Sequence, residues 1–536
     1  MGVKVSVIVP VYNPGPRLDS CLASLLGQSL SAGEYEVLFI DTGSADGTLQ
    51  RLDTLAEKHP HIRVIHAAHT GGPGRPRNVG IEVASGEYLY FLTAHDRLAS
   101  PALERMYAMA IRSSADIVVG KVVGYGANEV PRALFRESRD NADILAGDLF
   151  RLMTPHKLFR TGFLLRHRLR FAEGSAWLAD ERFVAEAYFL AKVTGVLSDG
   201  VCCHWGTPDR PSEQPPQRRL DPTAYTRSLR QLLDLVDTHT DPGDERDQIY
   251  ARFYQDLLLG PLGSPRSPGP FGLPGLHGGR SLRGRLVRQS PYALFREVRH
   301  LAAERFTTGV ERALPPSIRV RARLLHAGAY AEITKLARAE RGLTVVPTLD
   351  RVDWDGNALV IRASAQLTYA DGRPVTFRRV DGRLLWEPPV SLKTKVPIDA
   401  YDVTKVLSDS RLDVYVQSRE DSGDFRLPTQ CHLVPEVSDD TEQLVLQGTA
   451  RLDVRTGRLG RPLDAGTWDC FVRVESCGWE FWRRLTRPSL YQHTAPAPAR
   501  TLGTGDQGPV VEPHWTALGG LSVRVQRSPT HRAAAE

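Results

Sequence analysis

Two stretches of the sequence carry side chains that suit chemistry on a phosphate or a metal ion. GEYLYFLTAHD is an apolar run that ends in His95 and Asp96, and GGPGRPRNVG is a glycine-rich stretch that brings Arg77 to the start of a helix-like segment. Backbone amides at a helix start and a bidentate guanidinium both suit a phosphate. An imidazole can ligate Mn²⁺, Zn²⁺ or Ni²⁺ better than it ligates Mg²⁺.

A buried parallel sheet is expected to position these side chains. Residues 88–92 lack the alternation of a half-exposed strand, so we expect a central strand covered on both faces. Ligands of open α/β sheets bind outside the carboxyl ends of the strands, which places residues 93–96 at the ligand crevice. Further strands are expected at 5–11, 36–40 and 116–123, and amphipathic helices at 17–28 and 101–112.

The order of these motifs resembles a known family. VSVIVPVYNPG, LFIDTGSADGT and GGPGRPRNVGIEVASGEYLYFL come in the order and spacing of family 2 glycosyltransferases of the GT-A fold. The resemblance implies a Rossmann-like mixed sheet that binds a nucleotide-sugar. It also implies that Asp41 contacts uracil and Arg77 the diphosphate. The full set of donor-binding residues that it implies is Pro10, Tyr12, Asp41, Arg77 and Asp96.

The metal site of that family is altered in this sequence. In the family, an Asp-x-Asp motif holds a divalent metal, Mn²⁺ or Mg²⁺, against the diphosphate; here Thr93 and His95 stand at the two positions. Asp96 matches a frequent extra acid, and His204 matches a histidine that completes the metal site. The resemblance therefore implies His95, Asp96 and His204 as metal ligands. The alternative is a loop that has lost its metal.

A second group of matching residues lies between 152 and 181. In inverting transferases a Glu-Asp pair starts a helix and the Asp takes a proton from the acceptor hydroxyl. Asp180 keeps that position, although Ala179 replaces the Glu, and its alternative role is a helix cap. His156 and Lys157 match a stretch that lines the donor and acceptor pocket; they could reach a phosphate, or His156 could be a buried structural residue.

Composition limits the class of protein. A chain of 536 residues is expected to form three or four domains, and its net charge of +6 does not indicate a nucleic-acid binder. The N-terminus has no signal-peptide pattern and no window holds 18 apolar residues, so we expect a cytoplasmic protein. The arginines between 280 and 299 could bring it to an anionic membrane as a peripheral contact, or form a solvated helix face. The six scattered cysteines are expected to be free thiols.

The domain organisation is predicted from shifts in pattern. We expect a GT-A domain at 1–208, a helical connector with a Pro/Gly-rich loop at 209–342, and two all-β, Ig-like sandwich modules at 343–437 and 440–526. This architecture resembles bacterial wall teichoic acid glycosyltransferases. The resemblance implies that the β-modules support a homo-oligomer or hold a polymeric acceptor.

Two functions follow from these patterns. The first is an inverting glycosyltransferase that moves a sugar from a UDP-sugar to a hydroxyl of a cell-envelope polymer, with a glycan or polyol-phosphate acceptor. The second is a catalytically impaired homologue that acts as a glycan-binding or scaffold protein. Asp180 favours the first function, whereas Thr93, His95 and Ala179 favour the second.

Overall fold

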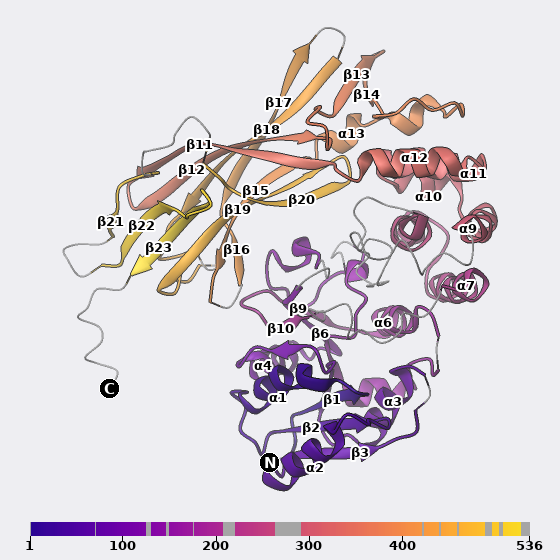
Figure 1. Ribbon diagram of the computed structural model, residues 1–536, viewed down its shortest axis with the longest axis vertical. Coiled ribbons are helices and arrows are strands. Elements are labelled where there is room, and N and C mark those ends of the chain that lie inside the picture. The colour runs from indigo at the N-terminus through magenta and orange to yellow at the C-terminus, as the bar shows by residue number, and fades with distance from the viewer. Residues whose placement is uncertain are drawn as a thin grey trace. The chain divides into compact units, whose positions relative to one another are not determined.

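The computed structural model divides the chain into two compact units (Figure 1). The first unit ends at Ala313 and the second begins at Leu314. The described residues are 2–69, 71–124, 130–145, 149–174, 176–206, 220–262, 291–420, 423–438, 441–457, 460–487, 496–502 and 508–526. The predicted fold class is confirmed, because a mixed α/β sheet is followed by helices and then by antiparallel β-sheets.

A seven-stranded mixed sheet forms the centre of the first unit, in the order β3-β2-β1-β4-β8-β6-β9. β1 to β4 run parallel, whereas β8 runs antiparallel to both of its neighbours. The strands are β1 (Val5–Val11), β2 (Tyr35–Asp41), β3 (Ile62–His66), β4 (Tyr88–Phe91), β6 (Ile117–Gly120), β8 (Leu158–Arg160) and β9 (Thr194–Leu197). Because β1 to β4 are parallel, the segments that follow them meet at one edge of the sheet, which we call the carboxyl edge.

Helices pack beside this sheet, and α1 to α4, which come after the parallel strands, begin at the same edge. The helices are α1 (Leu18–Leu26), α2 (Thr48–Lys58), α3 (Gly74–Val83), α4 (Ala102–Ser113), α5 (Thr161–Arg166) and α6 (Ala179–Leu190). α3 contacts β1 and β2, and α4 contacts β6 and β9. The expected helices at 17–28 and 101–112 are confirmed as α1, which is shorter, and α4, which is shifted by one residue.

The prediction of a central buried strand is confirmed in β4. All four of its residues are buried, and it lies between β1 and β8. The Phe91 ring lies 5.0 Å from Phe171 and 5.9 Å from Phe183 between ring centroids. Phe171 and Phe183 stack on each other at 3.8 Å and 14°. This aromatic contact fixes the first half of α6 to the middle of the sheet.

The single strand expected at 116–123 is two strands in two sheets. β6 belongs to the seven-stranded sheet, whereas β7 (Val122–Gly124) joins β5 (Arg97–Leu98) and β10 (Cys203–Trp205) in a small second sheet. The chain leaves the first sheet at Gly120, where a Cβ would lie 2.7 Å from Met106 Sδ and 2.8 Å from Cys202 Cβ. Only glycine fits this close approach.

The helices that follow α6 divide between the two units, so the connector predicted at 209–342 is not one body. α7 (Pro222–His239), α8 (Asp244–Phe253), α9 (Pro291–Arg305) and α10 (Thr308–Ala313) belong to the first unit, and α11 (Pro316–His326) and α12 (Tyr330–Glu340) to the second. A π-helix (Tyr254–Leu259) extends α8. Propensity alone predicts helices but does not specify which core they pack against.

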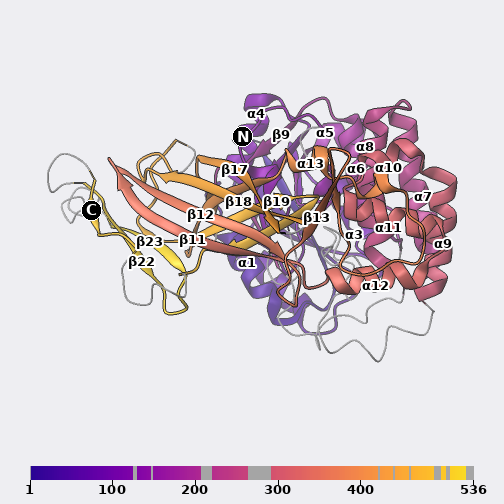
Figure 2. The same ribbon diagram turned by 90° about the horizontal axis from the view of Figure 1, so that it is seen from above.

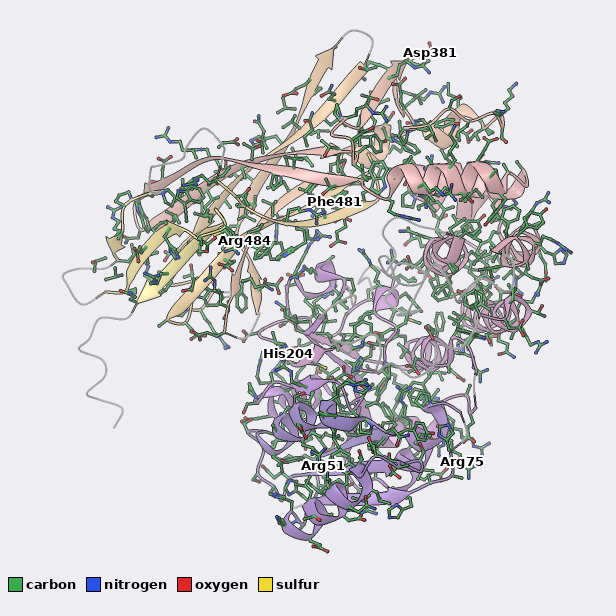
Figure 3. The ribbon with its side chains drawn as sticks, in the orientation of Figure 1. Arg51, Arg75, His204, Asp381, Phe481 and Arg484 are labelled. Carbon is green, nitrogen blue, oxygen red and sulfur yellow. The ribbon has the colours of Figure 1, made fainter. Side chains whose placement is uncertain are left out.

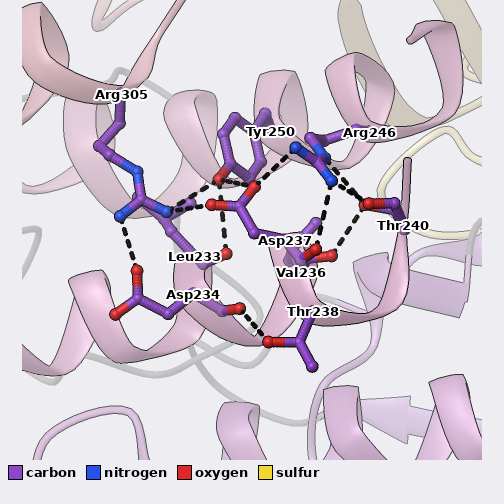
Figure 4. Close-up of polar contacts among 9 residues, drawn as sticks. All are labelled: Leu233, Asp234, Val236, Asp237, Thr238, Thr240, Arg246, Tyr250 and Arg305. Atoms are coloured by element: carbon purple, nitrogen blue, oxygen red, sulfur yellow. Dashed lines mark hydrogen bonds and ion pairs between the residues drawn. The ribbon is translucent and has the colours of Figure 1, made fainter. Parts of the chain in front are cut away.

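A polar network fastens α9 to α7 and α8 (Figure 4). Arg305 bonds Asp234 at 2.6 Å and Asp237 at 2.5 Å, and it donates to the Tyr250 hydroxyl at 3.1 Å. Tyr250 in turn donates to Asp237 at 2.7 Å. Because three helices share these half-buried groups, they hold one another in register.

The second unit contains two antiparallel sheets whose strands interleave along the chain. Figure 2 shows β11, β12 and β18 of one sheet side by side, as their pairing requires. That sheet comprises β11 (Thr344–Asp355), β12 (Ala358–Thr368), β13 (Thr376–Val380), β14 (Arg383–Trp386), β17 (Thr429–Ser438) and β18 (Thr441–Leu452). The other comprises β15 (Arg411–Ser418), β16 (Asp424–Arg426), β19 (Gly466–Ser476), β20 (Trp479–Arg484), β21 (Arg500–Thr501), β22 (Val510–Trp515) and β23 (Leu521–Gln526).

The predicted division into sandwiches at 343–437 and 440–526 is therefore wrong. β17 and β18 pair as a hairpin across that boundary, from Thr429↔Ala450 to Ser438↔Thr441. β15 and β16 precede this hairpin but belong to the other sheet, in which β15 pairs with both β16 and β19. Alternating apolar residues predict that strands exist, but they do not specify the partner of each strand.

Several predicted features lie partly or wholly outside the described residues. These are most of the Pro-rich linker, the Pro/Gly-rich loop and the arginines from 280 to 288; Arg296 and Arg299 are exposed on α9. All six cysteines are free, as predicted. No helix in the described part of the chain is both long and apolar enough to span a bilayer.

The first unit should fold without the second, but not without its last helices. α6 packs on α7, and the Phe150 ring lies 6.0 Å from Phe253 of α8. We expect a chain that ends at Ala313 to unfold in one cooperative thermal transition. A chain that ends at residue 208 should melt at a clearly lower temperature, because the apolar surface under α7 and α8 is exposed to water. Equal melting temperatures for the two truncated chains would contradict this division.

Candidate active site

The loops after β1 and β2 are fastened to each other at the carboxyl edge. The Asn13 side chain accepts a hydrogen bond from Ala45 N at 2.7 Å, and Asn13 N donates to Ser44 Oγ at 3.0 Å. Gly15 N donates to Asp46 Oδ2 at 2.8 Å. Asn13 has a φ of 45°, a left-handed conformation that asparagine tolerates. These bonds give the edge a defined shape.

The structure brings Pro10, Tyr12 and Asp41 together at this edge, as predicted. Pro10 pairs in register with Ile40, and the next residue pairs with Asp41. Asp41 is buried, and its Oδ2 accepts from Gly43 N at 3.0 Å and Ser44 N at 3.1 Å. A carboxylate held in this way has a fixed orientation.

His69 was missed by the sequence analysis. Its ring stacks on Tyr12 at 4.3 Å and 28°, and its Nδ1 lies 3.5 Å from Thr42 Oγ1. His69 follows β3, the third parallel strand, so its position after a strand end was the signal that could have found it. Tyr12 is 51% exposed, which leaves ring surface open beside Asp41.

Asp96 is a structural anchor. Its carboxylate has no exposed surface, and Oδ2 accepts from Thr93 Oγ1 at 2.5 Å and Thr93 N at 3.1 Å. His156 Nε2 lies 2.9 Å from the same oxygen, and Gly206 N donates to Oδ1 at 3.0 Å. These contacts join the tip of β4 to β8 and β10. They do not leave Asp96 facing a ligand, contrary to its predicted donor-binding role.

The residues predicted to hold a divalent metal do not form a suitable site. Both oxygens of Asp96 accept hydrogen bonds from the protein, and Thr93 donates its hydroxyl to Asp96. His204, labelled in Figure 3, lies on β10. The register of β10 places it opposite Arg97 of β5. No group of three or more His, Cys, Asp or Glu side chains among the described residues could hold a metal ion. The set His95, Asp96 and His204 is therefore not supported.

Asp180 pairs with Arg77 across the carboxyl edge. Arg77 Nη1 lies 2.5 Å from Asp180 Oδ1, although 103 residues separate them in the sequence. The helix cap of α6 is Leu178, with no side-chain capping bond, so the alternative role of Asp180 as the cap is excluded. The Asp180 side chain is 34% exposed, whereas that of Arg77 is 5% exposed. The arginine is enclosed and the carboxylate is accessible.

Two buried titratable groups lie close to this pair. Burial, with Asp180 as the second cause, raises the pKa of Glu181 to about 8, so Glu181 is mostly protonated at neutral pH. Burial lowers the pKa of Lys157 to about 7. Lys157 Nζ donates to the carbonyls of Leu152 and Thr154. The Lys157 ammonium is thus bonded to the loop before β8 and does not face a phosphate. His156 is buried against Asp96, which agrees with its alternative role as a buried structural residue.

The helix that carries Asp180 rests on α7. Trp177, just before α6, meets the Tyr225 ring edge-on at 6.1 Å, and the Tyr225 hydroxyl donates to Leu257 O at 2.8 Å. Arg182 Nη1 donates to Gln231 at 3.4 Å. The helices after the sheet therefore help to place the first turn of α6. Sequence reasoning did not connect them to the site.

Two family models match the chain. The model of glycosyl transferase family 2 matches residues 6–180, and the model of the glycosyl transferase TarS linker domain matches residues 222–337. The first match runs from β1 through β8 and ends at the start of α6, before β9. The second match covers the helices α7 to α11 and most of α12.

Curated relatives match over part of their length. The poly(ribitol-phosphate) beta-glucosyltransferase of Bacillus spizizenii is 32% identical over 198 residues, 37% of this chain and 31% of that protein. The poly(ribitol-phosphate) beta-N-acetylglucosaminyltransferase TarS of Staphylococcus aureus is 29% identical over 258 residues, 47% of this chain and 44% of that protein. The chain thus spans less than half the length of these relatives.

Solved structures show the same fold. Residues 1–349 of S. aureus TarS in complex with UDP-GlcNAc superpose with a TM-score of 0.53 at 21% identity, and cover 72% of this chain and 97% of that chain. A crystal structure of S. aureus TarS superposes with a TM-score of 0.50 at 20% identity, and covers 99% of this chain and 86% of that chain. The likeness extends through both units.

Nucleotide binding should respond little to a divalent cation. This expectation follows from Asp96, whose oxygens are engaged, and from Thr93 and His95, which supply no carboxylate. We expect the affinity for UDP, measured by calorimetry, to be nearly the same with Mg²⁺ and with a chelator. A gain of about tenfold on adding Mg²⁺, ~1.4 kcal/mol, would contradict it.

A single substitution distinguishes a chain that has lost only its metal ligands from one that has also lost its nucleotide site. His95→Asp supplies a carboxylate at a side chain that makes no hydrogen bond to Asp96, whereas an acid at Thr93 would replace the hydroxyl that is bonded to the Asp96 carboxylate and repel that carboxylate directly. UDP binding that His95→Asp makes dependent on Mg²⁺ would indicate that the surrounding site is intact.

Proposed function

We propose that the chain is an inverting glycosyltransferase, because residues 6–180 match the model of glycosyl transferase family 2 and residues 222–337 match that of the TarS linker domain. It moves a sugar from a UDP-sugar to a hydroxyl of a cell-envelope polymer. The single observation that carries the proposal is Asp180, an accessible carboxylate at the carboxyl edge with a fixed partner. The acceptor is a glycan or a polyol-phosphate chain, by analogy with the poly(ribitol-phosphate) relatives.

The donor base occupies the edge beside β1 and β2. Tyr12 offers an exposed ring face for stacking on uracil, and His69 supports that ring from its other face. The fixed carboxylate of Asp41 accepts a hydrogen bond from the uracil N–H. Pro10, at the end of β1, shapes the floor beneath the base. This arrangement favours a pyrimidine nucleotide.

Asp180 acts as the general base of a single displacement. The acceptor O–H bond breaks, its proton passes to Asp180, and the oxygen forms a bond to the anomeric carbon. The bond from that carbon to the UDP oxygen breaks at the same time, and UDP leaves with the electron pair. Attack from the side opposite to UDP inverts the configuration. Because the residues of the predicted metal site do not fit a metal ion, no step is assigned to one.

The remaining partners follow from this activity. UDP-sugars are cytoplasmic metabolites, so the proposed location is the cytoplasm, with peripheral contact at the inner membrane face through exposed arginines such as Arg296 and Arg299. A homo-oligomer through the second unit is part of the same proposal. Nothing in the charge of the chain favours a nucleic acid.

The geometry of the site gives less support to the alternative function, a glycan-binding or scaffold protein. This alternative is consistent with Thr93 and His95 in place of two acids. It gives no reason for a carboxylate that is oriented by a buried arginine and left one-third exposed. A protein that only binds glycans needs no such group.

Asp180→Asn is expected to lower transfer and leave nucleotide binding intact. The amide keeps the shape of the side chain, and its oxygen can still accept from Arg77, but it cannot take a proton. Transfer should fall by ~10²–10⁴-fold, equal to about 3–5 kcal/mol. UDP release is measured with UDP-glucose and UDP-GlcNAc as donors and a polyol-phosphate acceptor, and UDP affinity by calorimetry.

The matched control is Asp140→Asn. Asp140 is an exposed acid that pairs with Arg112 at 2.7 Å, far in sequence from the carboxyl edge. This variant should transfer as fast as the original chain. Full activity in Asp180→Asn, with UDP still bound, would remove Asp180 from the mechanism.

A further inference from the structure

The ion pair between Arg77 and Asp180 joins the first turns of two helices that are far apart in the chain. Arg77 lies in α3 and Asp180 in α6, and their contact is 2.5 Å between Nη1 and Oδ1. The sequence resemblance implied that Arg77 binds the diphosphate. The structure instead directs its guanidinium at the proposed base.

The guanidinium is held from behind by aromatic rings. Its carbon lies 4.8 Å from the centroid of the Phe171 ring. Phe171 stacks on Phe183, which follows Asp180 by three residues in α6, and both rings contact Phe91 of the central strand. The arginine is thus fixed by the same aromatic cluster that fixes the helix of its partner. The guanidinium therefore cannot move without disturbing this cluster.

The burial of the two groups is unequal. With 5% of its side chain exposed, Arg77 has little surface to offer a diphosphate, and its charge is already matched. Asp180 is 34% exposed, and only Oδ1 is bonded to Arg77. Withdrawing the guanidinium to reach a phosphate would leave a buried cation without its carboxylate, which is costly.

We propose that Arg77 is a positioning residue: it holds Oδ1 of Asp180 so that Oδ2 is presented to the acceptor hydroxyl. The proposal rests on the proposed function of Asp180 as the base. It also accounts for Ala179, because the acid that precedes the base in the resembling family is absent here and Arg77 orients Asp180 from the opposite helix. Arg77 touches neither the donor nor the acceptor in this role.

A double-mutant cycle tests the proposal with two readouts. Arg77→Met, Asp180→Asn and the double variant are compared in transfer and in UDP affinity. If Arg77 acts through Asp180, Arg77→Met should lower kcat by about 10²-fold, the cost of misplacing a reacting group. The double variant should be no slower than Asp180→Asn alone, because residues that act as a unit are not additive. UDP affinity and the donor KM should stay within a few-fold.

Two further variants keep the test decisive. Arg77→Lys preserves the charge, which a phosphate ligand needs, but it loses the planar fork and the stack on Phe171. Positioning predicts that Arg77→Lys loses most of the transfer rate while it binds UDP normally, even if Arg77→Met folds poorly. The matched control is Arg112→Met, which breaks the exposed pair with Asp140 and should change neither readout.

The outcomes separate this inference from the proposed function. Loss of UDP affinity in Arg77→Met that the retained charge of Arg77→Lys largely restores, with a transfer cost that adds to that of Asp180→Asn, would identify Arg77 as a diphosphate ligand and overturn the inference alone. Absence of transfer by the original chain with every UDP-sugar tried would overturn the proposed function, and the inference with it. Non-additive loss of kcat at constant UDP affinity supports both.

Discussion

The site depends on one constraint, the buried carboxylate of Asp96. A carboxylate with no contact to water must have its oxygens satisfied by the protein, and Asp96 takes bonds from Thr93, His156 and Gly206. Those partners come from the tip of β4, the residues before β8 and the end of β10. The carboxyl edge is thereby closed around Asp96, and the acid that could have faced a metal serves to hold the backbone instead.

The consequence is a division of labour among the charged groups of the edge. Asp41, which we propose binds the nucleotide, is oriented by two backbone amides after β2, whereas Asp180 is oriented by Arg77 and stays accessible. Glu181 and Lys157 are buried beside them with pKa values moved towards neutrality, which reduces the charge that the interior must carry. The accessible carboxylate of this group is therefore the one that the chemistry needs.

Features of the fold and the site that depend on residues close together in the sequence were predictable, whereas contacts between distant residues were not. The β-branched runs of β1 and β2 and the apolar run of β4 predicted the sheet, and the resemblance of the loops after them to family 2 glycosyltransferases predicted the grouping of Tyr12 and Asp41. The hydrogen bond between Asp96 and Gly206 joins residues that are 110 positions apart, and the ion pair between Arg77 and Asp180 joins residues that are 103 positions apart. No local sequence pattern predicts such pairs. The prediction of two consecutive sandwiches failed for the same reason. The sequence of β16 indicates a short strand but does not specify that β15 is its partner.

The central claim is a single displacement at the anomeric carbon with Asp180 as the base. The most direct test is the anomeric configuration of the product, read by proton NMR after transfer from an α-linked UDP-sugar to a polyol-phosphate acceptor. A single displacement must give a β-linked product. An α-linked product would require two displacements or a front-side attack, neither of which this arrangement of Asp180 and Arg77 provides, and it would contradict the account.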